Sequence, residues 1–254
     1  MTLRRAELVG VLERSRALGF LGPGPVEAHI DHAEGFAAAY QMLSGPGAPG
    51  RFADIGSGGG VPALALAVLW PDSEVVLIDS MVRRTSALSE FVRALGLERR
   101  CRVITDRVEA VARTSLRGSF PLVTARSFGP PAVTAECGGP LVELGGWLIV
   151  SEPPLVDEGR GATDVDSEDS PRSAAPDFAR EDRRAARNTS GLGVIADESE
   201  AVRRWPPFGL SVLGLAPACE LLTPNRFVGL RKVAPTGEVY PRRSGLPAKR
   251  PSWK

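Results

Sequence analysis

The chain has 254 residues, of which 24% are charged and 43% hydrophobic, and its formal net charge at pH 7 is +1. This near-neutral balance excludes a global electrostatic attraction to nucleic acid, so any basic surface must be local. No apolar run approaches membrane-spanning length, residues 1–10 lack a signal-peptide core, and the three cysteines form no C-x-x-C pair. We therefore expect a cytoplasmic, monomeric α/β domain with appendages, reduced cysteines and no membrane partner.

Periodic apolar positions predict a helical extension in residues 1–50. Its helices are expected at residues 2–18 and 26–43, separated by interleaved glycines and prolines. The second helix holds both histidines of the chain, His29 and His32, three positions apart. A metal site would need further ligands, and none lies nearby, so we interpret the pair as polar helix residues at the edge of the core or the substrate.

Short β-branched runs alternate with helical segments after residue 50 and predict a mostly parallel sheet. The expected strands lie at residues 51–55, 74–78, 102–104, 120–125, 147–150, 210–215 and 227–232, the last of them antiparallel. Residues 152–200 are acidic and poor in large apolar side chains, which predicts a disordered or loosely helical insertion. The sequence therefore predicts five parts: a helical extension (residues 1–50), a ligand-binding core (51–151), the insertion (152–200), a segment that completes the sheet (201–235) and a basic extended tail (236–254).

The turn after the first strand runs from Asp54 to Pro62 and carries Gly56, Gly58 and Gly60 at alternating positions. Glycine lets the backbone approach a ligand closely, and the next helix points its free N–H groups at the same place. The dinucleotide fingerprint fits poorly because its third glycine is missing, and the P-loop fingerprint fits poorly because its G-K-[S/T] is missing. An acid before the glycines suits a cationic ligand. The pattern D-x-G-x-G-x-G resembles the first motif of class I methyltransferases, which bind S-adenosyl-L-methionine; a bare turn is the alternative.

Three later strand ends carry further candidate groups. Asp79 ends the second strand, where a carboxylate can accept both ribose hydroxyls of an adenosine; the alternative is a cap for the next helix. The turn with Val108 and Glu109 follows the third strand, where adenine edges are read in this fold class, and the alternative is a helix N-cap by Asp106. Arg126 ends the fourth strand and could pin a ligand carboxylate or a substrate phosphate, or it is a surface charge.

The carboxyl tail, residues 240–254, is basic and free of acids, with prolines that keep it extended. Cations spaced along an extended segment suit a phosphate backbone, and Trp253 could stack on a base. The alternative is a solvated tail without a partner.

These segments together resemble the bacterial small-subunit rRNA methyltransferase G family, also called glucose-inhibited division protein B. The resemblance covers residues 51–151 and 226–251 and is carried by the glycine turn and by the segments 77–84, 107–109, 123–126, 144–146, 231–232 and 240–251. The tail is its more diagnostic part. The chain departs from the family in its acidic insertion and after the fifth strand, where Ser151-Glu152-Pro153-Pro154 replaces the usual lysine-glycine pair. It is therefore similar to a divergent member.

The resemblance implies a class I methyltransferase fold and transfer of a methyl group from S-adenosyl-L-methionine to N7 of a guanine in 16S rRNA, free or in the small ribosomal subunit. N7 is an exposed lone pair without a proton, so neither a strong base nor a metal is required. The implied cofactor-binding residues are Asp54, Gly56, Ser57, Gly58, Gly60, Asp79, Val108 and Glu109. Arg126 would be the catalytic anchor of ligand or rRNA, and further rRNA contacts would be His29, Arg242, Arg243 and Lys249. Two alternatives stay open: a small-molecule methyltransferase, and a non-catalytic RNA-binding or ligand-sensing relative.

Overall fold

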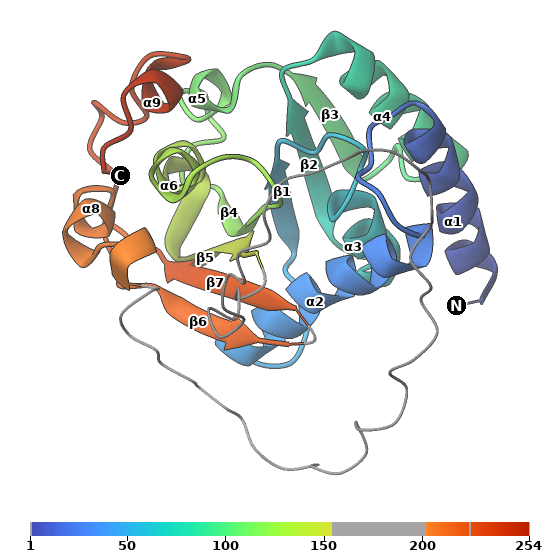
Figure 1. Ribbon diagram of the computed structural model, residues 1–254, viewed down its shortest axis with the longest axis horizontal. Coiled ribbons are helices and arrows are strands. Elements are labelled where there is room, and N and C mark those ends of the chain that lie inside the picture. Colours follow the sequence, from blue (N-terminus) through green and yellow to red (C-terminus); the bar gives the residue numbers. More distant parts are fainter. Residues whose placement is uncertain (1, 154–201, 224, 254) are drawn as a thin grey trace, which may run out of the picture. The chain divides into compact units, whose positions relative to one another are not determined.

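The computed structural model describes residues 2–153, 202–223 and 225–253 (Figure 1). Most of the predicted insertion therefore lies outside the described residues. The described chain forms a seven-stranded sheet of order β3-β2-β1-β4-β5-β7-β6. The strands are β1 Arg51–Ile55, β2 Glu74–Asp79, β3 Cys101–Thr105, β4 Phe120–Ala125, β5 Val142–Ser151, β6 Cys219–Leu222 and β7 Arg226–Arg231.

The first five strands are parallel to one another, and β7 pairs antiparallel with both β5 and β6. This arrangement confirms the predicted α/β class, the number of strands and the antiparallel pairing of the strand predicted at 227–232. The parallel strands place their carboxyl ends at one edge of the sheet, which is where ligands bind in open α/β folds.

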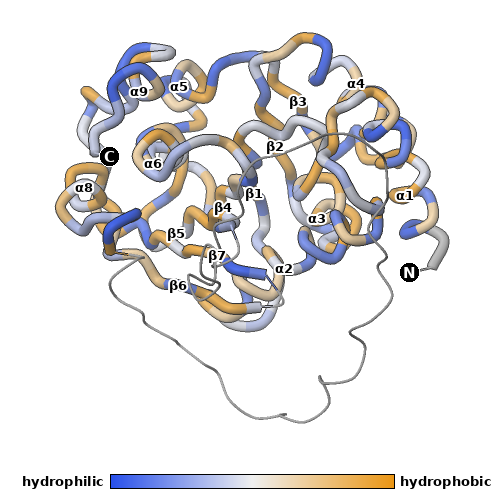
Figure 2. Tube along the Cα trace, viewed as in Figure 1, coloured by the Kyte–Doolittle hydropathy of each residue, from blue (hydrophilic) through white to orange (hydrophobic). Residues whose placement is uncertain are grey.

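Helices cover both faces of the sheet (Figure 1). One layer contains α1 Thr2–Ala17, α2 Val26–Ser44, α3 Ala63–Leu69 and α4 Val82–Ala94; the other contains α5 Val108–Val111, α6 Pro131–Gly138, the 3-10 helix Gly139–Leu141, α8 Pro207–Val212 and α9 Leu246–Lys249. Side chains alternate along each strand, so Phe52 faces the first layer and Ala53 the second. Figure 2 shows β4 and β5 mainly in the hydrophobic colour, because both faces of these strands are covered.

Two sequence expectations about strands need correction. The segment 210–215 is not a strand; it contains the end of α8, and the strand follows at β6. A short apolar run fits a buried helix as well as a strand, and Pro206-Pro207 starts the helix. The fifth strand begins at Val142 instead of residue 147, and its register against β4 shifts there, which the positive φ of Gly145 (+85°) permits.

Candidate active site

The glycine turn after β1 is held against the end of β2 by the side chain of Asp79. The backbone N–H of Gly58 donates to Asp79 Oδ2 at 3.0 Å, and that of Met81 donates to Oδ1 at 2.9 Å. Arg84 adds an ion pair to Oδ2 at 3.6 Å. The predicted juxtaposition of turn and carboxylate is therefore present, and Asp79 also serves the helix start that was its alternative role.

A pocket of about 320 Å³ opens beside this turn, at the carboxyl ends of the strands. We call it the first pocket. Of the predicted cofactor residues, it is lined by Gly56, Asp79, Val108 and Glu109. Arg84, Ser127, Phe128, Gly129 and Ala248 also line it. Residues far apart in the sequence thus surround one small-molecule-sized space.

The remaining residues of the turn hold its backbone against β2 and α3. The Ser57 hydroxyl donates to the carbonyl of Asp54 at 3.0 Å and accepts from the N–H of Ile78 at 3.2 Å. Gly60 has a φ of +96°, and a Cβ there would lie 2.5 Å from Leu64 Cδ1, so its requirement for glycine comes from helix packing. The predicted approach of Gly60 to a ligand is thus replaced by a contact with α3.

Asp54 is a buried acid with an unmet hydrogen-bonding requirement. Its side chain is 1% exposed, Thr124 Oγ1 donates to Oδ1 at 2.7 Å, and Oδ2 has no hydrogen-bond partner among the described residues. Burial raises the pKa of Asp54 to about 7, against the opposing hydrogen bonds from Thr124 and Ser57. A cationic ligand group would supply the missing partner and favour the ionised form.

Arg126, at the end of β4, is supported from α2. Its Nη2 lies 2.8 Å from Nδ1 of His29, whose Nε2 lies 3.2 Å from the carbonyl oxygen of Gly22. These partners assign a neutral ring that accepts through Nδ1 and donates through Nε2. Because His29 is 7% exposed and both its nitrogens are used, the predicted direct contact of His29 with rRNA is corrected to a supporting role.

A second pocket of about 370 Å³ adjoins the first and shares Ser127, Phe128 and Gly129 with it. The second pocket is also lined by His32, Arg126, Glu152, Arg204 and Trp205. Burial lowers the pKa of His32 to about 4, with Arg126 adding to the shift, so this ring is neutral at physiological pH.

Glu152 directly follows β5 and joins the end of this strand to a distant segment. Its carboxylate forms an ion pair with Arg204 Nε at 2.7 Å and accepts from Trp205 Nε1 at 3.1 Å. Sequence reasoning did not assign a role to Glu152, Arg204 or Trp205. The signal in the sequence was a lone acid directly after a buried strand.

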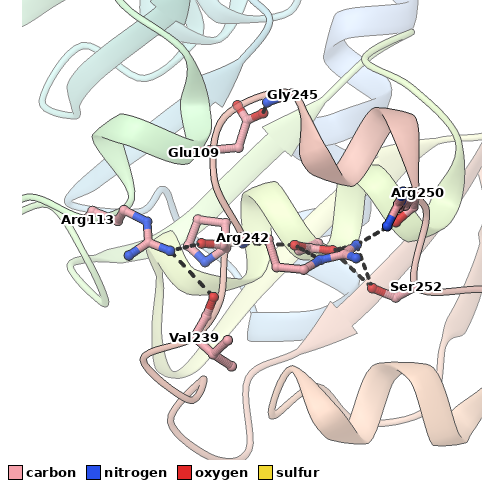
Figure 3. Close-up of polar contacts among 9 residues, drawn as sticks. Glu109, Arg113, Val239, Arg242, Gly245, Arg250 and Ser252 are labelled. Carbon is pink, nitrogen blue, oxygen red and sulfur yellow. Dashed lines mark hydrogen bonds and ion pairs between the residues drawn. The ribbon is translucent and has the colours of Figure 1, made fainter.

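The carboxyl tail is not extended; it folds back onto the core (Figure 3). Glu136 of α6 is fully buried, and its Oε1 accepts from Arg242 N at 2.9 Å and Nε at 2.8 Å. Its Oε2 accepts from Arg242 Nη2 at 2.6 Å and from Ser252 Oγ at 3.0 Å. We call these contacts the tail clamp. A buried carboxylate requires such a partner, so Arg242 holds the fold together, and its contact with rRNA stays a prediction.

The clamped tail also reaches the first pocket. Glu109 Oε1 accepts from the N–H of Gly245 at 2.8 Å (Figure 3). It also accepts from Arg107 Nη2 at 3.1 Å, and Ala248 lines the pocket. Glu109, predicted beside an adenine, thus holds the tail as well. The indole of Trp253 donates to the carbonyl of Arg204 at 3.1 Å, which ties this ring to the protein instead of leaving it free to stack on a base.

Arg243 and Lys249 remain exposed on the clamped tail. Across the described ranges, no cluster of three or more metal-ligating side chains occurs. The helices in those ranges are all too short or too polar to cross a membrane.

Comparison with known proteins places this geometry in context. Residues 36–152 match a family model, GidB, described as rRNA small subunit methyltransferase G. A Ribosomal RNA small subunit methyltransferase G from Roseiflexus castenholzii is 33% identical over 210 residues, which are 82% of this chain and 74% of the relative. Relatives of the same name from Syntrophomonas wolfei and Synechococcus sp. are 28% and 30% identical. They align with 90% and 80% of this chain, and with 87% and 66% of their own lengths.

Proposed function

The chain belongs to the rRNA small subunit methyltransferase G family, and we propose that it transfers a methyl group from S-adenosyl-L-methionine to N7 of a guanine in 16S rRNA. One observation carries the proposal. The matched residues build a small-molecule pocket at the carboxyl ends of the strands, with a glycine turn on one side and Asp79 on the other. We further propose that the enzyme acts as a cytoplasmic monomer on rRNA or the assembled small subunit.

The residues of the first pocket fit the cofactor. Each carboxylate oxygen of Asp79 accepts one backbone N–H and keeps a lone pair for a ribose hydroxyl. Val108 offers an apolar contact to the adenine, and Glu109 holds the wall on that side. Asp54 does not line this pocket, but it directly precedes the glycine turn, and its Oδ2, which has no hydrogen-bond partner among the described residues, suits the positive amino acid end of the ligand. When bound, the cofactor supplies an electrophilic methyl group on a sulfonium.

The protein's part in the reaction is positional. Guanine N7 carries no proton, so no side chain must act as a strong base, and rate enhancement comes mainly from holding the acceptor in line with the methyl group. Arg126 lies at the strand end where the acceptor must approach, and it is already oriented by His29. We assign it the role of anchoring the substrate.

The exposed cations of the clamped tail are proposed to contact rRNA phosphates. Removing the whole tail would also remove the clamp, so the test replaces only Arg243 and Lys249 by alanine, because both side chains are exposed. Loss of two phosphate contacts should lower the slope of log K against log salt by about 1.4–1.8. An unchanged slope would return both residues to a solvated role.

The decisive experiment uses labelled cofactor with small subunits, or their rRNA, from a strain that lacks the enzyme. We expect one 7-methylguanosine per rRNA by nucleoside mass spectrometry, with the Asp79→Ala variant as the impaired control. Label appearing in a metabolite and none in rRNA would support a small-molecule methyltransferase instead. Cofactor binding without any methyl transfer would identify a non-catalytic relative.

A further inference from the structure

A third pocket lies between α8 and the end of the carboxyl tail, which Figure 1 shows beside each other. Aromatic side chains from three separate segments line it, those of Phe208, Tyr240 and Trp253, and Val212 and Leu213 add aliphatic surface. These five residues do not line the first or the second pocket. The volume of the third pocket, about 250 Å³, is also smaller than theirs, and it suits one flat ring system.

Two walls of this pocket are fixed by contacts within the protein. The indole N–H of Trp253 donates to the carbonyl of Arg204 at 3.1 Å. The indole ring lies directly against the backbone of α8, because a Cβ added at Gly209 would lie 2.4 Å from Trp253 Cε3. The backbone of Tyr240 is held by Arg117, whose Nη1 donates to its carbonyl at 2.8 Å. A site whose walls are fixed in advance loses little conformational entropy when a ligand binds.

Phe208 differs from these walls, because its ring is open to solvent. It is 84% exposed, the largest exposed fraction of any large hydrophobic side chain that the structure describes. Val212, one helical turn further along α8, is 43% exposed. A phenyl ring left in water offers a flat apolar face, and free energy is gained when another ring covers that face.

Cations border the third pocket on the side of the tail. Arg113 donates to the carbonyl of Val239 at 3.4 Å (Figure 3), and Arg117 donates to that of the next residue, Tyr240. Arg250 is exposed just after α9. Within the described residues, these three arginines form no ion pair with a carboxylate. Carbonyl oxygens carry only partial charge, so the region keeps an excess of positive charge.

This excess of charge distinguishes between the partners that an apolar pocket could take. The exposed acid Glu238, two positions before Tyr240, offsets only one of the three arginine charges. A second copy of the chain would bring the same cations to the interface, and like charges repel. A single-stranded RNA segment carries phosphates for the arginines and bases for the exposed ring, and a base of any identity can stack on an aromatic side chain.

We propose that the third pocket binds one unpaired base of the substrate rRNA, which stacks on the ring of Phe208. The inference rests on the proposed function, because it names a further contact of the same rRNA. Pro206 lines the third pocket, and its neighbour Trp205 lines the second pocket at the strand ends. The stacked base is therefore expected close to the target guanine in the folded RNA, and Phe208 positions the substrate without touching the reacting atoms.

The test compares the full chain with Phe208→Ala, Phe208→Leu and Phe208→Trp. The control is Leu144→Ala, because Leu144 is 62% exposed near the start of β5, at the edge of the sheet opposite the carboxyl ends of the parallel strands. The substrates are 16S rRNA and small subunits from a strain that lacks the enzyme. Phe208→Ala should weaken rRNA binding and raise KM about tenfold, within the range for one lost base–aromatic stack. Its kcat and cofactor affinity should stay within about twofold of wild type.

Three readouts separate stacking from other contacts. The salt dependence of rRNA binding should stay unchanged in Phe208→Ala, because phenylalanine carries no charge and releases no counterions. Phe208→Trp should bind rRNA as well as wild type, whereas Phe208→Leu should resemble Phe208→Ala, because leucine is apolar but has no ring. A photocrosslinking phenylalanine analogue at position 208 should link to a nucleotide of the rRNA in the assembled small subunit.

Four outcomes would overturn the inference. They are a wild-type KM in Phe208→Ala, full rescue by Phe208→Leu, an equal effect of Leu144→Ala, and a crosslink from position 208 to a ribosomal protein or to a second copy of the chain. The last outcome would assign the pocket to a protein partner. A wild-type enzyme that leaves rRNA unmodified would overturn the proposed function itself. Wild-type methylation of rRNA that is insensitive to Phe208→Ala would overturn the inference alone.

Discussion

The tail clamp can be tested by replacing Glu136 with glutamine. The carboxylate accepts two hydrogen bonds at each oxygen, and glutamine would turn an NH₂ group toward donors of Arg242 and Ser252. Breaking a fully buried ion pair costs about 3–5 kcal/mol. The side chain of Arg242 is 23% exposed and can turn toward water, so we expect a smaller loss than this, about 2–3 kcal/mol.

Chemical and thermal denaturation measure this loss, which corresponds to roughly 4–12 °C in Tm for a chain of this size. Cofactor affinity should fall in parallel, since Ala248 of the tail lines the first pocket. Glu98→Gln is the control, because Glu98 is exposed before β3. Its effect should stay within about 0.5 kcal/mol. A Glu136→Gln protein of wild-type stability and wild-type cofactor affinity would refute the clamp.

The effect should also depend on pH with a defined sign. Burial disfavours ionisation of Glu136, but the hydrogen bonds from Arg242 and Ser252 outweigh it and hold its pKa below the ordinary value of 4.5. A lowered pKa contributes stability above the unfolded value and loses it as pH falls through the folded value. The stability difference between wild type and Glu136→Gln should therefore be constant near neutrality and shrink below about pH 4.5.

Three further predictions follow from buried contacts. Because burial raises the pKa of Asp54 to about 7, the wild type should lose stability as pH rises from about 4 to 7, by at most about 4 kcal/mol. The Asp54→Asn variant should show no such pH dependence in thermal scans. If the dependence persists in this variant, another group causes it. Asp79→Ala should weaken cofactor binding by roughly 1.5–3 kcal/mol in calorimetry, and an unchanged affinity would remove Asp79 from the site. Gly60→Ala should destabilise the protein by about 1–3 kcal/mol, because it forces a Cβ onto Leu64 at positive φ. Gly22→Ala is the control and should not destabilise it, because the space around Gly22 is open. Equal denaturation midpoints for the two variants would contradict this prediction.

The central sheet could be predicted because its signals are local. The strands at 51–55 and 120–125 have the predicted bounds, since each is a buried run that ends at turn residues. The meeting of Asp79 with Gly58 also followed, because β1 and β2 are adjacent and parallel and end at the same edge. The strand predicted at 210–215 was wrong, because periodicity does not distinguish a short buried helix from a strand.

The tail was misinterpreted because its partner is far away in the sequence. A basic segment without acids appears solvated when it is considered by itself, yet Arg242 binds Glu136 across 106 positions. One local signal was present. Glu136 is a single acid in the otherwise apolar or small-residue helix 131–138, and a charge in a buried helix requires a partner.

The buried acids around the two pockets differ in whether the protein supplies hydrogen-bond or ion-pair partners for their carboxylate oxygens. Glu109, Glu136 and Glu152 each hold a segment distant in the sequence, so their negative charges serve assembly of the pocket walls. Asp54 differs, because its Oδ2 has neither a hydrogen bond nor an ion pair within the described residues. Keeping that oxygen buried and unpaired costs stability. We expect a cationic group of the cofactor to pair with this oxygen, so cofactor binding should draw Asp54 into its ionised form and strengthen as pH rises through about 7.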